Sequence, residues 1–176
     1  MRVLAGRWKG RRLPAGPGAR PTSSRARKAL YDILGERIVG ARVLDLYAGS
    51  GALGIEAVSR GARAAVLVEP EAVPLCRTVQ RIGAGPDEVV VLAGGAASAV
   101  ADLAARAETF DFVFADPPYA DPLDEPMLAR IEGLLADGGW LVLQRDAGEP
   151  GPEIPGLSLT QRRDYGRNVF LFYGMR

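Results

Sequence analysis

The sequence predicts an α/β protein built on a doubly wound, mostly parallel sheet of seven strands. From residue 42 onward, short apolar runs alternate with amphipathic segments of helical period. A glycine-rich turn follows the first apolar run, as expected where a strand passes directly into a helix. Two alternating segments close the sequence and can pair as an antiparallel hairpin. Strands that alternate with helices favour right-handed parallel crossovers.

The individual elements follow from this pattern in chain order. Apolar runs predict strands at 42–46, 65–69, 88–92, 110–115 and 139–144. Amphipathic segments predict crossover helices at 51–60, 71–82, 96–107 and 122–135, the last starting near its proline. The C-terminal hairpin is expected at 158–163 and 168–173.

A separate N-terminal part precedes the alternating region. Apolar segments at 2–5 and 11–13, joined by a glycine-containing turn, predict a short β-hairpin extension. The stretch 14–21 is rich in proline and glycine and predicts a connector. A helix should then begin at Thr22, Ser23 or Ser24, any of which is a suitable N-cap. We therefore expect a hairpin arm and connector at 1–20 and one domain at 21–176.

Composition limits the possible chemistry. The chain has 176 residues, of which 48% are hydrophobic, enough for one domain with a sizeable core. It has one cysteine and no histidine, which excludes a disulfide framework, a Cys/His zinc site and histidine-based catalysis. We expect no metal site. No leader peptide or membrane-spanning run is recognisable, so we expect a cytoplasmic protein without a membrane partner.

The net charge of +1 hides a strong asymmetry. Residues 1–31 contain nine Lys and Arg residues and no acid, which leaves thirteen basic residues against 21 acidic ones in the remainder. This split favours a basic arm that meets a polyanion, with a solvated basic tail as the alternative. Trp8 within the arm could stack on a nucleobase or anchor the hairpin to the domain.

The turn after the first strand predicts a nucleotide-cofactor site. Residues 49–54, G-S-G-A-L-G, satisfy G-x-G-x-x-G, a weak signal by itself. Asp45 ends the strand, where it would repel a pyrophosphate but attract an ammonium or sulfonium group. The turn therefore favours S-adenosylmethionine over a dinucleotide. Glu69 ends the next strand, where such folds place an acid on a ribose hydroxyl pair. The alternative for both acids is helix capping.

The fourth strand ends in a second motif, formed by Asp116, Pro117, Pro118 and Tyr119. Ligands of open α/β sheets bind beyond the carboxyl ends of the strands, so this turn should lie beside Asp45. The prolines stiffen it and leave carbonyl acceptors, and the aspartate adds carboxylate acceptors. Two acceptors beside an aromatic ring suit a planar amino group, as on guanine, adenine or cytosine.

Several stretches together resemble one family. They are R-P-T-S-S-R-A-R-K-A-L-Y-D-I-L, L-Y-A-G-S-G-A-L-G-I-E-A-V-S-R-G-A and A-D-P-P-Y, with the opening M-R-V-L-A-G-R-W-K-G-R-R-L and the late Y-G-R-N. The chain is similar over most of its length to the bacterial 16S ribosomal RNA guanine-N2 methyltransferases, the RsmD family. The resemblance implies a Rossmann-like methyltransferase domain with a short N-terminal hairpin. It also implies a substrate of 16S ribosomal RNA, within a small subunit or an assembly intermediate.

The resemblance implies roles for three groups of residues. The cofactor group is Asp45, Tyr47, Ala48, Gly49, Ser50, Gly51, Glu69, Pro70, Gly95 and Ala96. The group that binds and positions guanine is Asp116, Pro117, Pro118 and Tyr119. The RNA-binding group combines the basic arm with the R-P-T-x-x-R-x-R element: Arg7, Lys9, Arg11, Arg12, Arg20, Thr22, Arg25 and Arg27. We expect the protein to act as a monomer.

The sequence departs from the family at two places. Where the family usually has an acid that reaches the cofactor adenine, this chain has A-G-G-A at 93–96. We expect a backbone group at Gly95 or Ala96 to take its place. Lys28 stands where the family often has glutamate, which changes only the local charge.

Four other functions remain open at this point. One is methylation of a different amino group, either adenine N6 or a glutamine side chain. Another is nicotinamide-dependent oxidoreduction, against which Asp45 and the missing histidine argue. A third is RNA binding without catalysis. Methylation at pyrimidine C5 would need a cysteine nucleophile, but Cys76 falls within a predicted helix, where we expect a buried structural residue.

Overall fold

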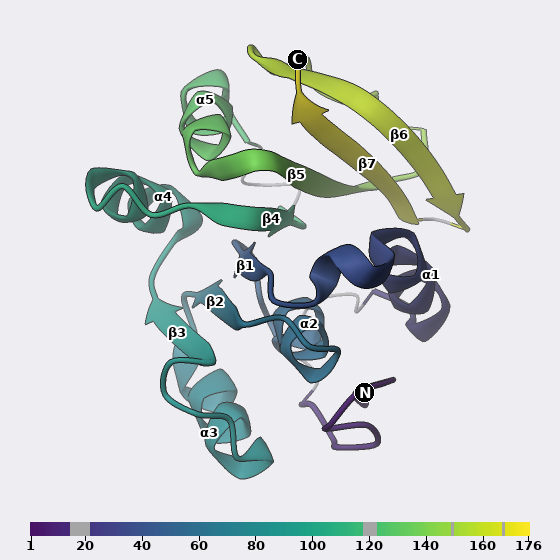
Figure 1. Cartoon of the computed structure of the whole chain (residues 1–176), viewed down its shortest axis with the longest axis vertical. Coiled ribbons are helices and arrows are strands. Elements are labelled where there is room, and N and C mark those ends of the chain that lie inside the picture. Colours follow the sequence, from purple (N-terminus) through teal and green to yellow (C-terminus); the bar gives the residue numbers. More distant parts are fainter. Residues whose placement is uncertain (15–21, 118–122, 149, 167) are drawn as a thin grey trace.

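The computed structural model describes residues 1–14, 22–117, 123–148, 150–166 and 168–176, and it contains one seven-stranded sheet (Figure 1). The strands are β1 (Arg42–Asp45), β2 (Ala64–Glu69), β3 (Val89–Ala93), β4 (Phe110–Ala115), β5 (Leu135–Asp146), β6 (Leu157–Tyr165) and β7 (Asn168–Met175). Their spatial order is β3-β2-β1-β4-β5-β7-β6. The first five strands are parallel, and β7 pairs antiparallel with both β5 and β6. The predicted doubly wound sheet with its C-terminal hairpin is confirmed.

Helices cover both faces of the sheet. They are α1 (Ser24–Leu34), α2 (Ala52–Ser59), α3 (Ala72–Ile82), α4 (Ala96–Ala105) and α5 (Glu125–Gly133), with a 3-10 turn η1 (Gly35–Ile38) after α1. One hydrophobic core joins α1, α2 and α3 to the sheet, and a second joins α4 and α5 to its other face (Figure 1). Within the described ranges, no helix combines the length and the apolar character needed to cross a membrane.

The predicted boundaries hold to within a few residues except around β5. That strand begins at Leu135 rather than 139, and α5 ends correspondingly early at Gly133. The Phe110 N–H donates to the Leu134 carbonyl at 2.8 Å, and the register then shifts between Phe110 and Phe112. Pairing with β4 therefore overrides the helical pattern of this stretch, because tertiary hydrogen bonds outweigh local propensity. At the α1 start, Ser23 is confirmed as the N-cap, since its Oγ accepts from the Ala26 N–H.

The N-terminal segment, residues 1–14, folds back on itself and docks on the domain. A single antiparallel bridge, Arg2 to Arg12, closes the predicted hairpin. Val3, Trp8 and Leu13 are buried in the same core as α2. Trp8 is therefore an anchor, and the alternative of a solvated basic tail is wrong for these residues.

Docking of this segment depends on a buried acid of α2. All eight residues of α2 are buried, so this mainly apolar helix needs cover on both sides. The Glu56 carboxylate accepts hydrogen bonds from the Leu4 and Ala5 N–H groups at 2.7 and 2.9 Å. It also forms an ion pair with Arg60 at 2.8 Å. Glu56 thus accepts hydrogen bonds from two backbone N–H groups of the N-terminal segment. Without it, docking would shield these N–H groups from water and leave them with no acceptor.

We predict that Glu56→Ala lowers the free energy of unfolding by about 3 kcal/mol, because it leaves the Leu4 and Ala5 N–H groups without their acceptor and the partly buried Arg60 without its partner. Urea denaturation followed by circular dichroism measures the change. Asp32→Ala, which removes the exposed Lys28–Asp32 pair on α1, is the control and should cost no more than about 1 kcal/mol. Equal effects of the two substitutions would contradict the assignment of Glu56 as the anchor.

Candidate cofactor and substrate site

Three carboxylates meet at one edge of the sheet. Asp45 ends β1, Glu69 ends β2, and Asp116 follows β4 directly. Strands β2 and β4 flank β1 in parallel, with Asp45 in register with Leu67 and Phe114. Their carboxyl ends therefore face the same side, where ligands of such sheets bind.

The glycine turn between β1 and α2 is shaped by close contacts. Gly51 is the N-cap of α2 and adopts a left-handed conformation with φ 74°, which favours glycine. A Cβ on Gly54 would lie 2.1 Å from Leu67 Cδ2, so a larger residue here would force the buried Leu67 side chain to shift where α2 packs on β2. The Gly49 N–H donates to Glu69 Oε2 at 2.8 Å. The end of β2 therefore holds the turn in place.

Asp45 is a buried acid with few compensating contacts. Its side chain is 2% exposed, and Oδ2 accepts from the Gly54 N–H at 3.2 Å. Burial, together with the nearby Asp116 and Glu69 carboxylates, raises the pKa of Asp45 to about 7, although backbone hydrogen bonds from Gly54 and Tyr47 act to lower it. A cation placed beside these acids would stabilise their ionised forms. The site therefore fits a positively charged ligand, as the sequence predicts.

Asp116 belongs to a chain of polar side chains. Gln144, the residue of β5 beside it, donates from Nε2 to Asp116 Oδ2 at 2.9 Å. Thr22 in turn donates from Oγ1 to Gln144 Oε1 at 2.8 Å. Burial raises the pKa of Asp116 to about 6, Asp146 raises it as well, and Arg145 lowers it.

Gln144 is a site residue that the sequence analysis misses. A single glutamine at the end of an apolar strand forms no motif. The one available signal is its position: it follows the run L-V-L at the carboxyl end of a strand predicted in the same parallel sheet. A polar residue at that place is a candidate for the ligand edge.

The other residues predicted for the cofactor surround the same edge. Ala48, Ser50 and Gly51 are buried in the turn, Tyr47 and Gly49 are half-buried, and Pro70 is exposed after Glu69. The Gly94 N–H donates to the Glu69 carbonyl at 3.3 Å. This bond brings the A-G-G-A segment beside the end of β2, with Gly95 exposed as the N-cap of α4 and Ala96 buried.

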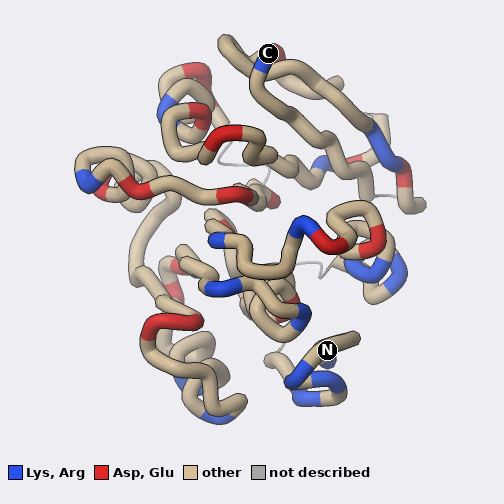
Figure 2. Tube along the Cα trace, in the orientation of Figure 1, with Lys and Arg blue, Asp and Glu red and all other residues tan. Residues whose placement is uncertain are grey.

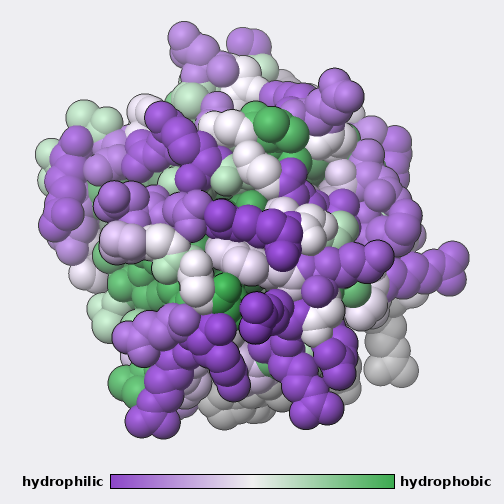
Figure 3. Space-filling view, turned by 60° about the horizontal axis from the view of Figure 1, so that its bottom comes forward, coloured by the Kyte–Doolittle hydropathy of each residue, from purple (hydrophilic) through white to green (hydrophobic). Residues whose placement is uncertain are grey.

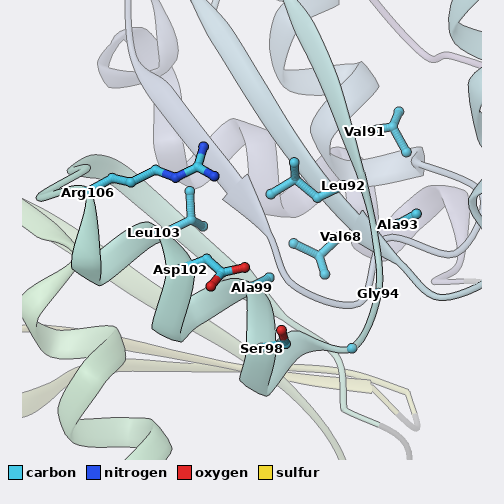
Figure 4. Close-up of a pocket in the computed structure, with 11 residues that line it drawn as sticks. Val68, Val91, Leu92, Ala93, Gly94, Ser98, Ala99, Asp102, Leu103 and Arg106 are labelled. Atoms are coloured by element: carbon cyan, nitrogen blue, oxygen red, sulfur yellow. The ribbon is translucent and has the colours of Figure 1, made fainter.

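A shallow cavity of about 200 Å³ begins at this segment (Figure 4). It runs between β3 and α4 from Gly94 and Gly95 past Leu92 to Asp102 and Arg106. None of Asp45, Glu69 and Asp116 lines it. The cavity therefore adjoins the three-carboxylate edge only at its glycine end, and its other end faces away from that edge.

Five of the cations that the sequence assigns to RNA are exposed to solvent. Arg7, Lys9, Arg11 and Arg12 are exposed on the docked segment, and Arg25 is exposed on α1. Figure 2 shows these basic residues gathered over the N-terminal segment and α1. Arg7 also pairs with Glu88 at 2.9 Å. Arg20, Pro118 and Tyr119 lie outside the described residues.

Arg27 is wrong as a surface contact to RNA. It is fully buried, and its Nη2 donates to the Arg2 carbonyl at 2.6 Å. Helical periodicity places it one position after Ala26 on the buried side of α1, and the docked N-terminal segment covers it there. Its guanidinium therefore contacts the protein backbone rather than solvent.

Two further expectations concern reactive side chains. Cys76 is exposed on α3, so the expectation of a buried residue is wrong; it points to solvent from the polar side of a strongly amphipathic helix. Across the described ranges, no group of three or more His, Cys, Asp or Glu side chains is placed to hold a metal ion.

The described surface offers no extended apolar face. The large hydrophobic side chains that are exposed are Val39 after η1, Val73 on α3, and Leu159 and Met175 on the paired strands β6 and β7. Hydrophilic side chains cover most of the face shown in Figure 3, with apolar ones in small groups between them. Isolated exposed hydrophobic residues are normal on soluble domains.

The fold and this edge define a class of protein: a Rossmann-like methyltransferase domain, with a glycine turn after β1 and an acid–proline turn after β4. The family model described as Conserved hypothetical protein 95 matches residues 1–174. This chain belongs to that family, and the membership inferred from the motifs is confirmed.

Individual relatives agree with this assignment. Ribosomal RNA small subunit methyltransferase D of Escherichia coli K12 is 39% identical, over 98% of this chain and 89% of its own length. The putative rRNA methyltransferase YlbH of Bacillus subtilis is 32% identical over 100% of both chains. The solved structure of the Escherichia coli putative methyltransferase yhhF has a TM-score of 0.87 at 33% identity, covering 100% of this chain and 98% of that one. The predicted Rossmann-like fold is confirmed by this likeness.

We predict that Asp45→Asn stabilises the protein at neutral pH. The pKa of Asp45 in the folded state, about 7, lies above the value of about 3.9 for an unfolded aspartate. The folded state thus loses stability as the pH rises from about 4 to 7, and asparagine removes that loss. The gain should be on the order of 2 kcal/mol at pH 8 and smaller at pH 5.

Urea unfolding at the two pH values measures the gain. Asp32→Asn, on the exposed surface of α1, is the control and should show no gain that grows with pH. If Asp45→Asn changed the free energy of unfolding equally at pH 5 and pH 8, the conclusion that burial and neighbouring acids raise the pKa of Asp45 would be contradicted.

Proposed function

We propose that this protein transfers a methyl group from S-adenosylmethionine to the exocyclic N2 of a guanine in 16S ribosomal RNA. The single observation that carries this proposal is the position of Asp116 and Pro117, at the same sheet edge as the glycine turn and Asp45. Membership in a family whose relatives include ribosomal RNA small subunit methyltransferase D supports the choice of substrate.

The cofactor would lie across the ends of β1 and β2. When bound, S-adenosylmethionine supplies a methyl group activated by its sulfonium charge. Asp45 and the turn residues Tyr47, Ala48, Gly49, Ser50 and Gly51 would hold its amino-acid part. Glu69 and Pro70 would hold the ribose, and backbone groups at Gly95 and Ala96 the adenine. Two features support this fit: the crowded carboxylates favour a cation, and the left-handed Gly51 opens the turn.

The guanine amino group would be oriented by the turn after β4. Its nitrogen lone pair is delocalised into the ring, which makes it a weak nucleophile. Asp116 and the Pro117 carbonyl would each accept a hydrogen bond from one of its two N–H groups and so direct the lone pair at the methyl group. The gain in rate then comes from positioning and preorganised polar groups. Asp116, with its pKa raised to about 6, is a stronger base than an ordinary aspartate and would take the proton that the nitrogen loses. Pro118 and Tyr119 would complete the turn, with the ring stacked on the base.

RNA would approach over the docked N-terminal segment and the start of α1. The exposed cations Arg7, Lys9, Arg11, Arg12 and Arg25 support this surface, with Thr22 and Arg20 completing it. The target guanine would leave its stack to reach Asp116, as bases in loops do most easily. We propose that the extension, residues 1–20, and the domain, residues 21–176, bind RNA together.

The proposed setting is a small ribosomal subunit or one of its assembly intermediates, in the cytoplasm. We propose that the protein acts there as a monomer. The described residues support this because they expose only four large hydrophobic side chains, of which Leu159 and Met175 alone lie on neighbouring strands.

We predict that Asp116→Ala lowers the single-turnover rate of methyl transfer by about 10²–10³, because it removes a preorganised acceptor from the transition state. Cofactor affinity, measured by calorimetry, should change little. The assay is transfer of labelled methyl groups to hypomethylated small subunits, followed by digestion and identification of the methylated nucleoside. Asp137→Ala, at an exposed position of β5, is the control. Wild-type rates in Asp116→Ala would sink the role of Asp116, and N6-methyladenosine as product would overturn the substrate.

We predict that Arg11→Gln with Arg12→Gln flattens the salt dependence of RNA binding. Two lost phosphate contacts should reduce the slope of log K against log salt by about 1.5. Filter binding of 16S ribosomal RNA at several salt concentrations measures the slope. The matched control is Arg106→Gln with Arg130→Gln, two exposed cations on or beside α4 and α5. Substitution is preferable to truncation because Glu56 would lose its partners if the segment were removed. Equal slopes in the two double variants would exclude this surface.

A further inference from the structure

Three side chains from distant parts of the sequence form one hydrogen-bonded chain at the substrate edge. Thr22 precedes α1, Gln144 lies near the end of β5, and Asp116 follows β4. The Thr22 hydroxyl donates to Gln144 Oε1 at 2.8 Å, and Gln144 Nε2 donates to Asp116 Oδ2 at 2.9 Å. Gln144 is only 7% exposed, so water competes little for these bonds.

The direction of the chain follows from the chemistry of an amide. A glutamine amide has one donor end and one acceptor end. The Thr22 hydroxyl satisfies the acceptor end, which leaves the NH₂ end turned toward the carboxylate. With Oδ2 held in this way, rotation of the Asp116 carboxylate is restricted and Oδ1 keeps a defined direction. A neutral donor achieves this without placing another charge in the site.

The surroundings of Asp116 make this orientation significant. Asp146 on β5 and Asp45 on β1 are acids close enough to shift the protonation equilibria at this edge, and Arg145 acts in the opposite sense. Burial further disfavours the ionised carboxylate. A hydrogen bond from Gln144 favours the ionised form, which is the form whose free Oδ1 accepts a hydrogen bond from an amino group.

We propose that Gln144 is a positioning residue that holds Asp116 in its reactive orientation, and that Thr22 fixes the amide of Gln144. This inference rests on the proposed role of Asp116 in methyl transfer. It also gives Thr22 a function at the reacting group that is separate from contact with RNA. The start of α1, beside the exposed Arg25, is thereby connected to the substrate edge.

The first test compares variants of Gln144 and Thr22 in the single-turnover assay with hypomethylated small subunits. Gln144→Leu should lower the rate by about 10², the loss typical of a misplaced reacting group. Thr22→Val should lower it by about 10-fold, as expected for one lost hydrogen bond. Thr22→Ser restores the hydroxyl and should recover most of the rate. Thr160→Val, which removes a comparable bond to the Phe172 carbonyl on the β6–β7 hairpin, is the control.

The second test is the pH dependence of the same rate. In the wild type the rate should fall as the pH drops through about 6, where Asp116 becomes protonated. Loss of the Gln144 donor raises the pKa of Asp116. The acidic limb of the pH–rate profile, where the rate falls with decreasing pH, should therefore move to higher pH in Gln144→Leu. Cofactor affinity should remain unchanged in every variant. A purely structural role of Gln144 would lower the rate without moving the limb.

The outcomes separate this inference from the proposed function. If Asp116→Ala keeps the wild-type rate, the proposed role of Asp116 itself fails. If Asp116→Ala is inactive but Gln144→Leu keeps both the wild-type rate and the wild-type pH profile, only the positioning role is overturned. Should Gln144→Leu fail to fold, the Thr22→Val and Thr22→Ser pair decides, since equal rates in these two variants would also overturn it.

Discussion

The parallel arrangement of β1, β2 and β4 is the constraint on which the site depends. It directs three strand ends to one edge and so brings Asp45, Glu69 and Asp116 together. Burial and mutual repulsion raise the pKa of Asp45 to about 7 and favour a cation beside it. A fold that crowds acids at this edge is less stable without its ligand and is suited to a positively charged methyl donor.

The glycine turn imposes a second requirement, which the N-terminal segment meets. Close packing of α2 on β2 through Gly54 buries this apolar helix completely, so its outer side must also be covered. Val3, Trp8 and Leu13 provide that cover, and Glu56 holds the backbone of the segment. The same segment presents Arg11 and Arg12 to solvent (Figure 2). A basic surface is thus attached directly to the helix that follows the proposed cofactor turn.

Much of the fold could be predicted because its signals are local. Alternating apolar runs and helical stripes located the seven strands and five α-helices of the described residues, although not the 3-10 turn η1. The G-x-G-x-x-G and D-P-P-Y turns located the ligand edge. The errors arose where tertiary contacts overrode those signals. Pairing with β4 extended β5 backward to Leu135, and the docked segment covered Arg27, which the resemblance had assigned to RNA through the R-P-T-x-x-R-x-R element. Cys76 was misplaced because its side of α3 faces solvent.

The sequence by itself determined the order of the elements, the glycine turn and the acids at the strand ends, because each depends on residues that are neighbours in the chain. Only the tertiary structure decided which polar groups meet. Thr22 and Gln144 are 122 residues apart, and Leu4 and Glu56 are 52 residues apart. Periodicity shows which face of an element is buried, but a hydrogen bond between elements depends on their relative placement to within a fraction of an ångström.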